Sequence, residues 1–155
     1  MISSEWHSLL TEFCSAWRDH DPARLEALWD TDYPNLVYIA EERRDPIIGW
    51  EAIRAYYRET LDLMSWMKVK IKPIQLSTVG EVSWLIGKGS WAGQNRTRSH
   101  VSGGYSRVCF LARRKNSDLR LIQYVEAPLN ARYVRPLRLG KTRSEESVFP
   151  DESRS

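Results

Sequence analysis

The sequence predicts a single α+β domain, in which two or three helices pack on one face of a bent, mostly antiparallel sheet. Three observations predict it. Amphipathic helical segments come first in the chain, long alternating segments follow, and short polar turns separate those segments. Helices followed by runs of strands are typical of α+β domains. A chain of 155 residues is long enough for one such domain with its own hydrophobic core.

Two helices are predicted at the start of the chain. The first, residues 5–20, carries apolar side chains at spacings of three and four: Trp6, Leu9, Leu10, Phe13 and Trp17. Ser3 or Ser4 is available as its N-cap. The second and shorter helix starts within residues 19–30, with Asp21 as the cap and Pro22 at the first helical position, where a missing amide costs nothing. Both helices are expected to pack against the sheet that follows.

Residues 36–61 are predicted to form a strand, a tight turn and a third helix. Alternation from Leu36 to Glu41 is typical of a strand, and Pro46 and Gly49 end it. Apolar side chains at helical spacing then follow: Ile53, Tyr56, Tyr57 and Leu61. Glu41 and Glu42 stand at the end of the apolar strand, where a carboxylate can face a cavity instead of water.

Four more segments complete the predicted sheet. Residues 68–76 alternate until Pro73, which indicates a bend, a bulge or an edge strand. The next strand is predicted at residues 81–93, and a polar connection follows at 93–100. A long strand at 101–114 leads through a hairpin turn at 115–118 to the last strand, 119–128, which Pro128 stops. By strict alternation Gln123 shares a face with Leu119, Leu121 and Val125. Glu126 then falls on the opposite face with Tyr124, where an interface role is the simpler interpretation.

The long strand has two partly apolar faces. One face carries Tyr105, Arg107, Cys109 and Leu111, and the other carries Ser106, Val108, Phe110 and Ala112. Such a pattern indicates that one face meets the helices and the other meets a second subunit. A homodimer through the sheet is therefore expected.

Composition narrows the classes of partner. The formal net charge is only +3 and the basic residues are scattered, which argues against a nucleic-acid partner. No segment has the form of a signal peptide or a membrane span, so a cytoplasmic protein is expected, without a membrane partner and with two buried thiols, Cys14 and Cys109. Beyond about residue 137 the chain becomes polar and charged, which predicts a domain at 1–137 and a disordered tail at 138–155.

Several of these segments together resemble a known superfamily. They are the helix 5–20, DPARLEALW, the strand ending at Glu41, the turn Pro46-Ile47-Ile48-Gly49, IRAYY and the final RLIQYVEAP. The chain resembles the ketosteroid isomerase, SnoaL-like polyketide cyclase and nuclear transport factor 2-like superfamily over about residues 5–135. The resemblance implies a cone-shaped domain, a cystatin-like roll, whose open end holds a ligand and whose convex face pairs into a dimer.

The resemblance also suggests an acid–base site. It places a proton-shuttling acid at Glu41, or one residue to either side at Glu42 or Ala40; the alternative is that residues 41–45 form a solvated charged turn. His100 and Arg107 are the candidate electrophilic partners. The isomerase branch's tyrosine donor aligns with Phe13 and its second acid with Cys109. Because Phe13 cannot donate a hydrogen bond and Cys109 donates weakly, ketosteroid isomerisation itself is not expected.

The remaining candidates would line a hydrophobic pocket. Six aromatic residues are assigned to its wall, with a purely structural core role as the alternative: Phe13, Trp17, Tyr38, Tyr56, Trp66 and Trp84. Cys109 and Gln123 complete the predicted binding set. No metal-ligand spacing, phosphate loop or nucleophile motif is present, so neither metal nor cofactor is expected. The sequence thus favours a cofactor-free isomerase, cyclase or dehydratase acting on an apolar carbonyl compound; the alternative is a non-catalytic ligand-binding or association module of the same fold.

Overall fold

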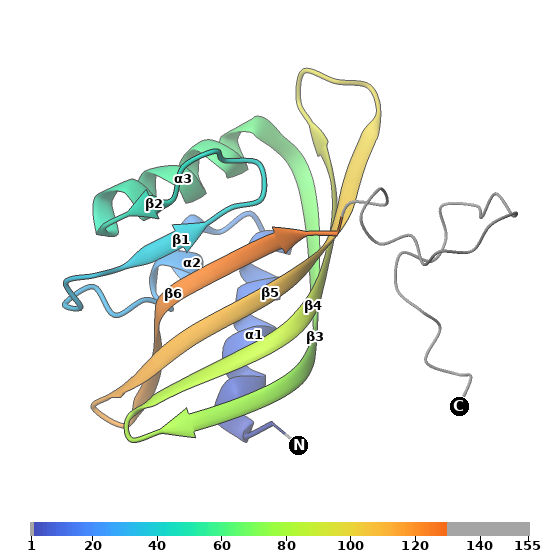
Figure 1. The fold of residues 1–155 in the computed structure, drawn as a ribbon. Coiled ribbons are helices and arrows are strands. Elements are labelled where there is room, and N and C mark those ends of the chain that lie inside the picture. The colour runs from blue at the N-terminus through green and yellow to red at the C-terminus, as the bar shows by residue number, and fades with distance from the viewer. Residues whose placement is uncertain (1, 130–155) are drawn as a thin grey trace, which may run out of the picture.

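The computed structural model describes residues 2–129, and the predicted α+β class is confirmed (Figure 1). The helices and strands follow in the order α1 (Ser4–Arg18), α2 (Pro22–Glu26), β1 (Val37–Ile39), β2 (Ile47–Ile48), α3 (Trp50–Leu63), β3 (Met64–Val79), β4 (Val82–Asn95), β5 (Val101–Lys115) and β6 (Asp118–Pro128). One six-stranded sheet has the order β2-β1-β6-β5-β4-β3. Only the β1–β6 pair is parallel among these strands. The predicted tail and the last residues of the predicted domain, 130–155, lie outside the described residues.

Helix α1 lies across the concave face of the curved sheet (Figure 1). Its N-cap is Ser3, and the indole N–H of Trp6 donates to Ser83 Oγ on β4 at 3.0 Å. Farther along, the ring of Phe13 lies 5.2 Å from Phe110 and 5.3 Å from Tyr124, measured between ring centroids. These contacts hold α1 against β4, β5 and β6, and α1 also packs along β3. The predicted cap and first-position roles of Asp21 and Pro22 in α2 are also confirmed.

The join between α3 and β3 is a sharp corner held by a histidine. Gly49 precedes α3 with φ +88°, a conformation that glycine adopts without strain. At the other end, Nε2 of His20 lies 3.1 Å from the carbonyl oxygen of Leu61 and 2.8 Å from that of Met64. Since both partners are acceptors, the ring nitrogen donates to them, and the Leu61 carbonyl also accepts from the backbone N–H of Met64, the C-cap of α3. His20 therefore ties the end of α3 to the start of β3.

Three irregularities interrupt the strand pairing. In the β3–β4 ladder the register shifts between Met64 and Trp66 and between Pro73 and Gln75, as the position of Pro73 predicted. In the β5–β6 ladder Leu111 pairs with Gln123 but Ala112 pairs with Leu121, so Ile122 is an extra residue on β6. Each extra residue exchanges the two faces of the strand beyond it.

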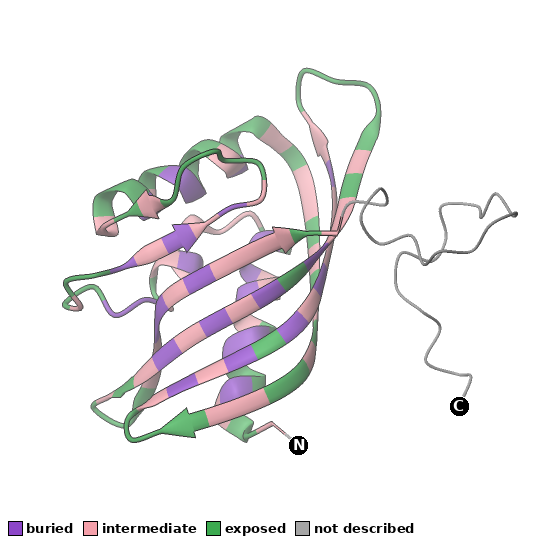
Figure 2. Ribbon diagram, in the orientation of Figure 1, coloured by how far each residue is buried: buried purple, intermediate pink, exposed green. Residues whose placement is uncertain are grey.

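The two faces of the sheet differ in burial, and buried residues alternate with less buried ones along β4, β5 and β6 (Figure 2). The inner face carries the core, including Leu85, Val108, Phe110 and Tyr124. No described helix covers the outer face (Figure 1). Cys109 lies there and is half-buried, as is Cys14, so the two thiols are less buried than expected. Within residues 2–129 no helix has the length and apolar character needed to cross a bilayer.

Candidate functional site

A cavity of about 510 Å³ lies between the helices and the inner face of the sheet. This volume is within the usual range for small-molecule sites. Most of its wall is apolar or aromatic. From the helices come Phe13 and Trp17 on α1 and Tyr56, Thr60 and Leu63 on α3, and from the strands come Tyr38, Met64, Met67, Val69, Ile71, Trp91 and Tyr124. Exposed Glu42, Arg43 and Leu63 mark its mouth.

Glu41 contributes a carboxyl to the wall, directly after β1. Its Oε1 accepts a hydrogen bond from the indole N–H of Trp91 on β4 at 2.7 Å. Its Oε2 is buried and accepts no hydrogen bond from any described residue. Burial raises the pKa of Glu41 above its ordinary value; the Trp91 hydrogen bond opposes this effect, and the nearby Glu42 carboxylate adds to it. The carboxyl is therefore oriented by one donor and kept short of solvation, as a general base requires.

Gly104 on β5 makes room for this contact. A Cβ at position 104 would lie 3.1 Å from Nε1 of Trp91 and 3.5 Å from Oε1 of Glu41. Since Gly104 pairs with Trp91 across the β4–β5 ladder, any side chain there would press on the hydrogen bond. The glycine at position 104 is therefore explained by the close approach of the Trp91 and Glu41 side chains to the backbone of β5.

A second carboxyl in the wall belongs to Glu126 on β6. Its Oε1 accepts from the hydroxyl of Tyr124 at 2.8 Å, and its Oε2 accepts from the backbone N–H of Glu41 at 3.1 Å. Burial raises the pKa of Glu126 to about 7, although the Glu41 N–H and the Tyr124 hydroxyl lower it, and the charges of Glu41 and Glu42 add to the rise. This carboxyl therefore holds its proton more strongly than a solvated glutamate does.

The third glutamate stands at the mouth of the cavity. Oε1 of Glu42 accepts from the hydroxyl of Tyr56 at 2.7 Å. Burial raises the pKa of Tyr56, so its hydroxyl stays protonated and remains a donor. The neighbouring Arg43 lies over the Tyr56 ring at 5.6 Å and forms an ion pair with Glu59 at 3.3 Å. Its side chain is 47% exposed, so it belongs to the rim and not to the interior.

The structure brings five of the predicted site residues together around this cavity. They are Glu41 and four of the six assigned aromatic residues, Phe13, Trp17, Tyr38 and Tyr56. These aromatic residues are also part of the buried core, so both interpretations of them hold at once. Of the three positions considered for the acid, Glu41 is the one with a carboxyl inside the wall, since Glu42 is exposed. The alternative of a fully solvated charged turn fits residues 42–45 but not Glu41.

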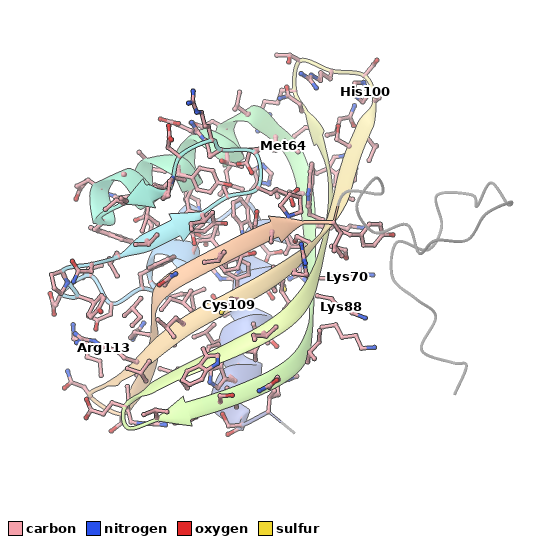
Figure 3. All side chains as sticks on the ribbon, in the orientation of Figure 1. Met64, Lys70, Lys88, His100, Cys109 and Arg113 are labelled. Carbon is pink, nitrogen blue, oxygen red and sulfur yellow. The ribbon has the colours of Figure 1, made fainter. Side chains whose placement is uncertain are left out.

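The two predicted partners of Glu41, His100 and Arg107, do not reach the cavity, and neither does Cys109 of the predicted binding set. His100 is exposed near the tip of the β4–β5 hairpin, beyond the body of the sheet (Figure 3). Arg107 and Cys109 lie on the outer face of β5, because the inner face is taken by Ser106, Val108 and Phe110. The prediction that these three lie in the pocket was wrong. Alternation correctly grouped Arg107 with Cys109 but did not say which face was inside.

Three further predictions fail because of strand geometry. Trp66 follows the bulge after Met64, which turns Met64 and Met67 inward and Trp66 away. Trp84 shares the outer face of β4 with Ile86. Gln123 is turned outward by the extra residue Ile122, and the same shift brings Tyr124 and Glu126 inward. None of the three lines the cavity.

Sequence reasoning therefore missed Glu126 and Trp91. Two consecutive buried residues, Leu121 and Ile122, accompany the bulge on β6, and their apolar pair in the sequence was the available signal for it. By alternation Trp91 shares a face of β4 with Leu85, Gly87 and Gly89, and Gly89 and Trp91 on that face line the cavity. Among residues 2–129 no group of three or more His, Cys, Asp or Glu side chains is arranged to hold a metal ion.

The comparisons with known proteins agree on the fold. A candidate dehydratase of the nuclear transport factor 2-like family from Streptomyces avermitilis is similar over 82% of this chain and 96% of its own, at 13% identity and a TM-score of 0.72. A candidate scytalone dehydratase from Novosphingobium aromaticivorans covers 80% of this chain and 81% of its own, with 8% identity and a TM-score of 0.71. A ketosteroid isomerase-like protein from Erwinia carotovora covers 82% and 95%, with 14% identity and a TM-score of 0.67.

Sequence comparisons identify a family. No curated protein matches the chain. The sequence profile of the SnoaL-like domain, however, matches residues 7–129, which include every helix and strand of the fold except the first three residues of α1. The fold of the chain is that of the nuclear transport factor 2-like structures. The chain therefore belongs to the SnoaL-like domain family.

Proposed function

We propose that this protein is a cofactor-free acid–base enzyme, an isomerase, cyclase or dehydratase, that acts on an apolar carbonyl compound with Glu41 as its base. One observation carries the proposal. Glu41 lines an apolar cavity, its Oε1 is fixed by Trp91 at 2.7 Å, and its buried Oε2 has no hydrogen-bond partner among the described residues. Buried carboxyls with raised pKa values are typical of catalytic sites.

The proposed step is removal of a proton from the carbon next to a carbonyl group. A carboxylate withdrawn from water is a stronger base than a solvated one, because its charged form has lost hydration. Isomerisation, cyclisation and dehydration of carbonyl compounds can all begin with this step, so Glu41 has the same role in each. The names of the similar structures, which include candidate dehydratases and an isomerase-like protein, support this group of reactions.

Hydrogen exchange tests the base directly, whatever the full reaction is. The probe is 2-tetralone in D₂O, a small apolar ketone with acidic protons beside its carbonyl, and NMR follows the loss of those protons. We expect the protein to accelerate exchange and Glu41→Gln to lose about a hundredfold of that acceleration. Glu51→Gln is the matched control, because Glu51 lies on α3 with its side chain 81% exposed and neither lines the cavity nor pairs with Arg43.

The alternative is a non-catalytic module that binds a small hydrophobic ligand. It is favoured by the position of Arg107 and His100, which leaves no described basic side chain in the interior of the cavity. In that case 2-tetralone binds without accelerated exchange, and Glu41→Gln changes only its affinity. That result would refute the enzyme proposal.

We also propose a cytoplasmic homodimer that associates through the outer face of the sheet. That face carries partly exposed apolar residues that no described helix covers, among them Trp84, Ile86, Leu111 and Val125. Ile86 is 40% exposed at its centre. Sedimentation should give a dimer that Ile86→Glu converts to a monomer, and a wild-type monomer would contradict the proposal.

A further inference from the structure

The charges around the cavity have one predominant sign. Among residues 2–129 the charged side chains that line it are Glu41, Glu42, Glu126 and Arg43. The guanidinium of Arg43 is at the rim, over the ring of Tyr56 and paired with Glu59. The interior therefore presents carboxyl groups without an opposing cation. Such a cavity disfavours a carboxylate or phosphate on the ligand and favours a positive charge.

Glu126 is the carboxyl best placed to receive that charge. It is partly accessible in the wall, and its two oxygens are oriented by the Tyr124 hydroxyl at 2.8 Å and the Glu41 N–H at 3.1 Å. Each carboxylate oxygen retains a second lone pair for another donor. Within residues 2–129 Glu126 forms no ion pair, and burial raises its pKa to about 7. A bound cation would restore the ionised form.

The surrounding walls suit a cation attached to an apolar body. Aromatic rings of Trp17, Tyr56, Trp91 and Tyr124 line the same cavity as Glu126. The faces of aromatic rings attract ammonium groups, and the attraction grows when water is excluded. A carboxylate beside aromatic faces is a common arrangement for binding protonated amines. Met67 and Val69 in the same wall can contact the hydrocarbon part of the ligand.

We propose that the substrate of this cavity carries a protonated amine on an apolar ring or chain, held at Glu126, while Glu41 remains available as the base. The inference rests on the proposed function, since it names the substrate class of the same site. The ammonium group of such a substrate would also stabilise the enolate. When Glu41 takes the proton, the C–H electron pair moves into the enolate, the substrate's own ammonium balances the charge on its oxygen, and Glu41 then returns the proton to the product.

Three indole probes of nearly the same shape test the charge preference: tryptamine, which is cationic, tryptophol, which is neutral, and indole-3-propionate, which is anionic. Calorimetry on the full chain measures the affinity of each. We expect tryptamine to bind at least about tenfold tighter than tryptophol, which corresponds to about 1.4 kcal/mol, and indole-3-propionate to bind most weakly. Glu126→Gln should abolish the preference for tryptamine. Glu51→Gln should preserve it, because Glu51 lies on α3 with its side chain 81% exposed and does not line the cavity. Circular dichroism checks that both variants fold.

The pH dependence gives a second readout. The preference for tryptamine should increase as pH rises through about 7, because ionised Glu126 binds the cation. The titratable groups around Glu126 are Glu41 and Glu42 after β1, Tyr38 on β1, Tyr56 and Tyr57 on α3, and Tyr124 on β6. The tyrosines stay neutral across this range because burial raises their pKa values. The charge of Glu41 also acts on Glu126, and repeating the pH series in Glu41→Gln removes that contribution.

Three results would each overturn the inference. Tryptophol or indole-3-propionate could bind as tightly as tryptamine, or none of the three probes could bind at millimolar concentration. The preference for tryptamine could also survive in Glu126→Gln. Failure of the proposed function gives a different pattern. Tryptamine would then bind with a preference that depends on Glu126, which supports the inference, while 2-tetralone would show no exchange that depends on Glu41.

Discussion

Replacing Glu126 by glutamine should change how the stability of the protein depends on pH. In wild type, burial raises the Glu126 pKa from 4.5 to about 7, a difference of about 2.5 pH units. At about 1.4 kcal/mol per unit this amounts to roughly 3 kcal/mol, and the partial accessibility of the side chain reduces it to about 2–3 kcal/mol. Glutamine keeps the shape, since its oxygen can accept from the Glu41 N–H and its amide can donate to the Tyr124 hydroxyl.

The direction of the effect follows from proton binding. Below pH 4.5 Glu126 is protonated in both states and contributes no penalty. Between 4.5 and about 7 the unfolded chain releases this proton while the folded protein keeps it, so the free energy of unfolding falls as pH rises. Above about 7 the penalty is complete and constant.

Urea unfolding across this pH range measures the effect. We expect the free energy of unfolding of Glu126→Gln, relative to wild type, to increase by about 2–3 kcal/mol between pH 4.5 and pH 8. Most other titrations cancel in that difference, and Glu51→Gln, with its side chain 81% exposed, controls for loss of a carboxylate on the surface. Parallel pH profiles for wild type and Glu126→Gln would refute the assignment of a raised pKa to this residue.

Two more predictions concern single hydrogen-bond donors. Trp91→Phe removes the N–H that holds Glu41 Oε1, a hydrogen bond of a kind that stabilises the ionised form by roughly 1–3 kcal/mol, so the Glu41 pKa should rise further. Carbon-detected NMR titration of the Glu41 carboxyl measures that pKa, and an unchanged or lower value would contradict the contact. His20→Asn retains a residue that tolerates the observed φ of 57° but cannot reach the carbonyls of Leu61 and Met64, so it should lower the free energy of unfolding by about 1–2 kcal/mol. A change below about 0.5 kcal/mol in urea unfolding would show that the α3–β3 corner does not depend on it.

The sequence by itself determined the fold class and most of its elements. Periodicity located α1, α3 and the long strands, because a helix and a strand expose apolar side chains at different spacings. Local chemistry located the boundaries: Asp21 and Pro22 begin α2, Gly49 begins α3, and Pro73 marks a break in the pairing of β3. Glu41 was accessible to prediction for the same reason, since it ends an apolar strand.

Only the tertiary structure decided which side chains meet in the cavity. Strict alternation placed Gln123 inside and Glu126 outside, and the single extra residue Ile122 reverses both. The bulge after Met64 likewise turns Trp66 away, while Arg107 and Cys109 lie on the outer face because Ser106 and Phe110 pack inward. A strand's alternating pattern is symmetric between its two faces, so the inside is chosen by the helices that cover it and by one-residue shifts in pairing, neither of which local sequence specifies.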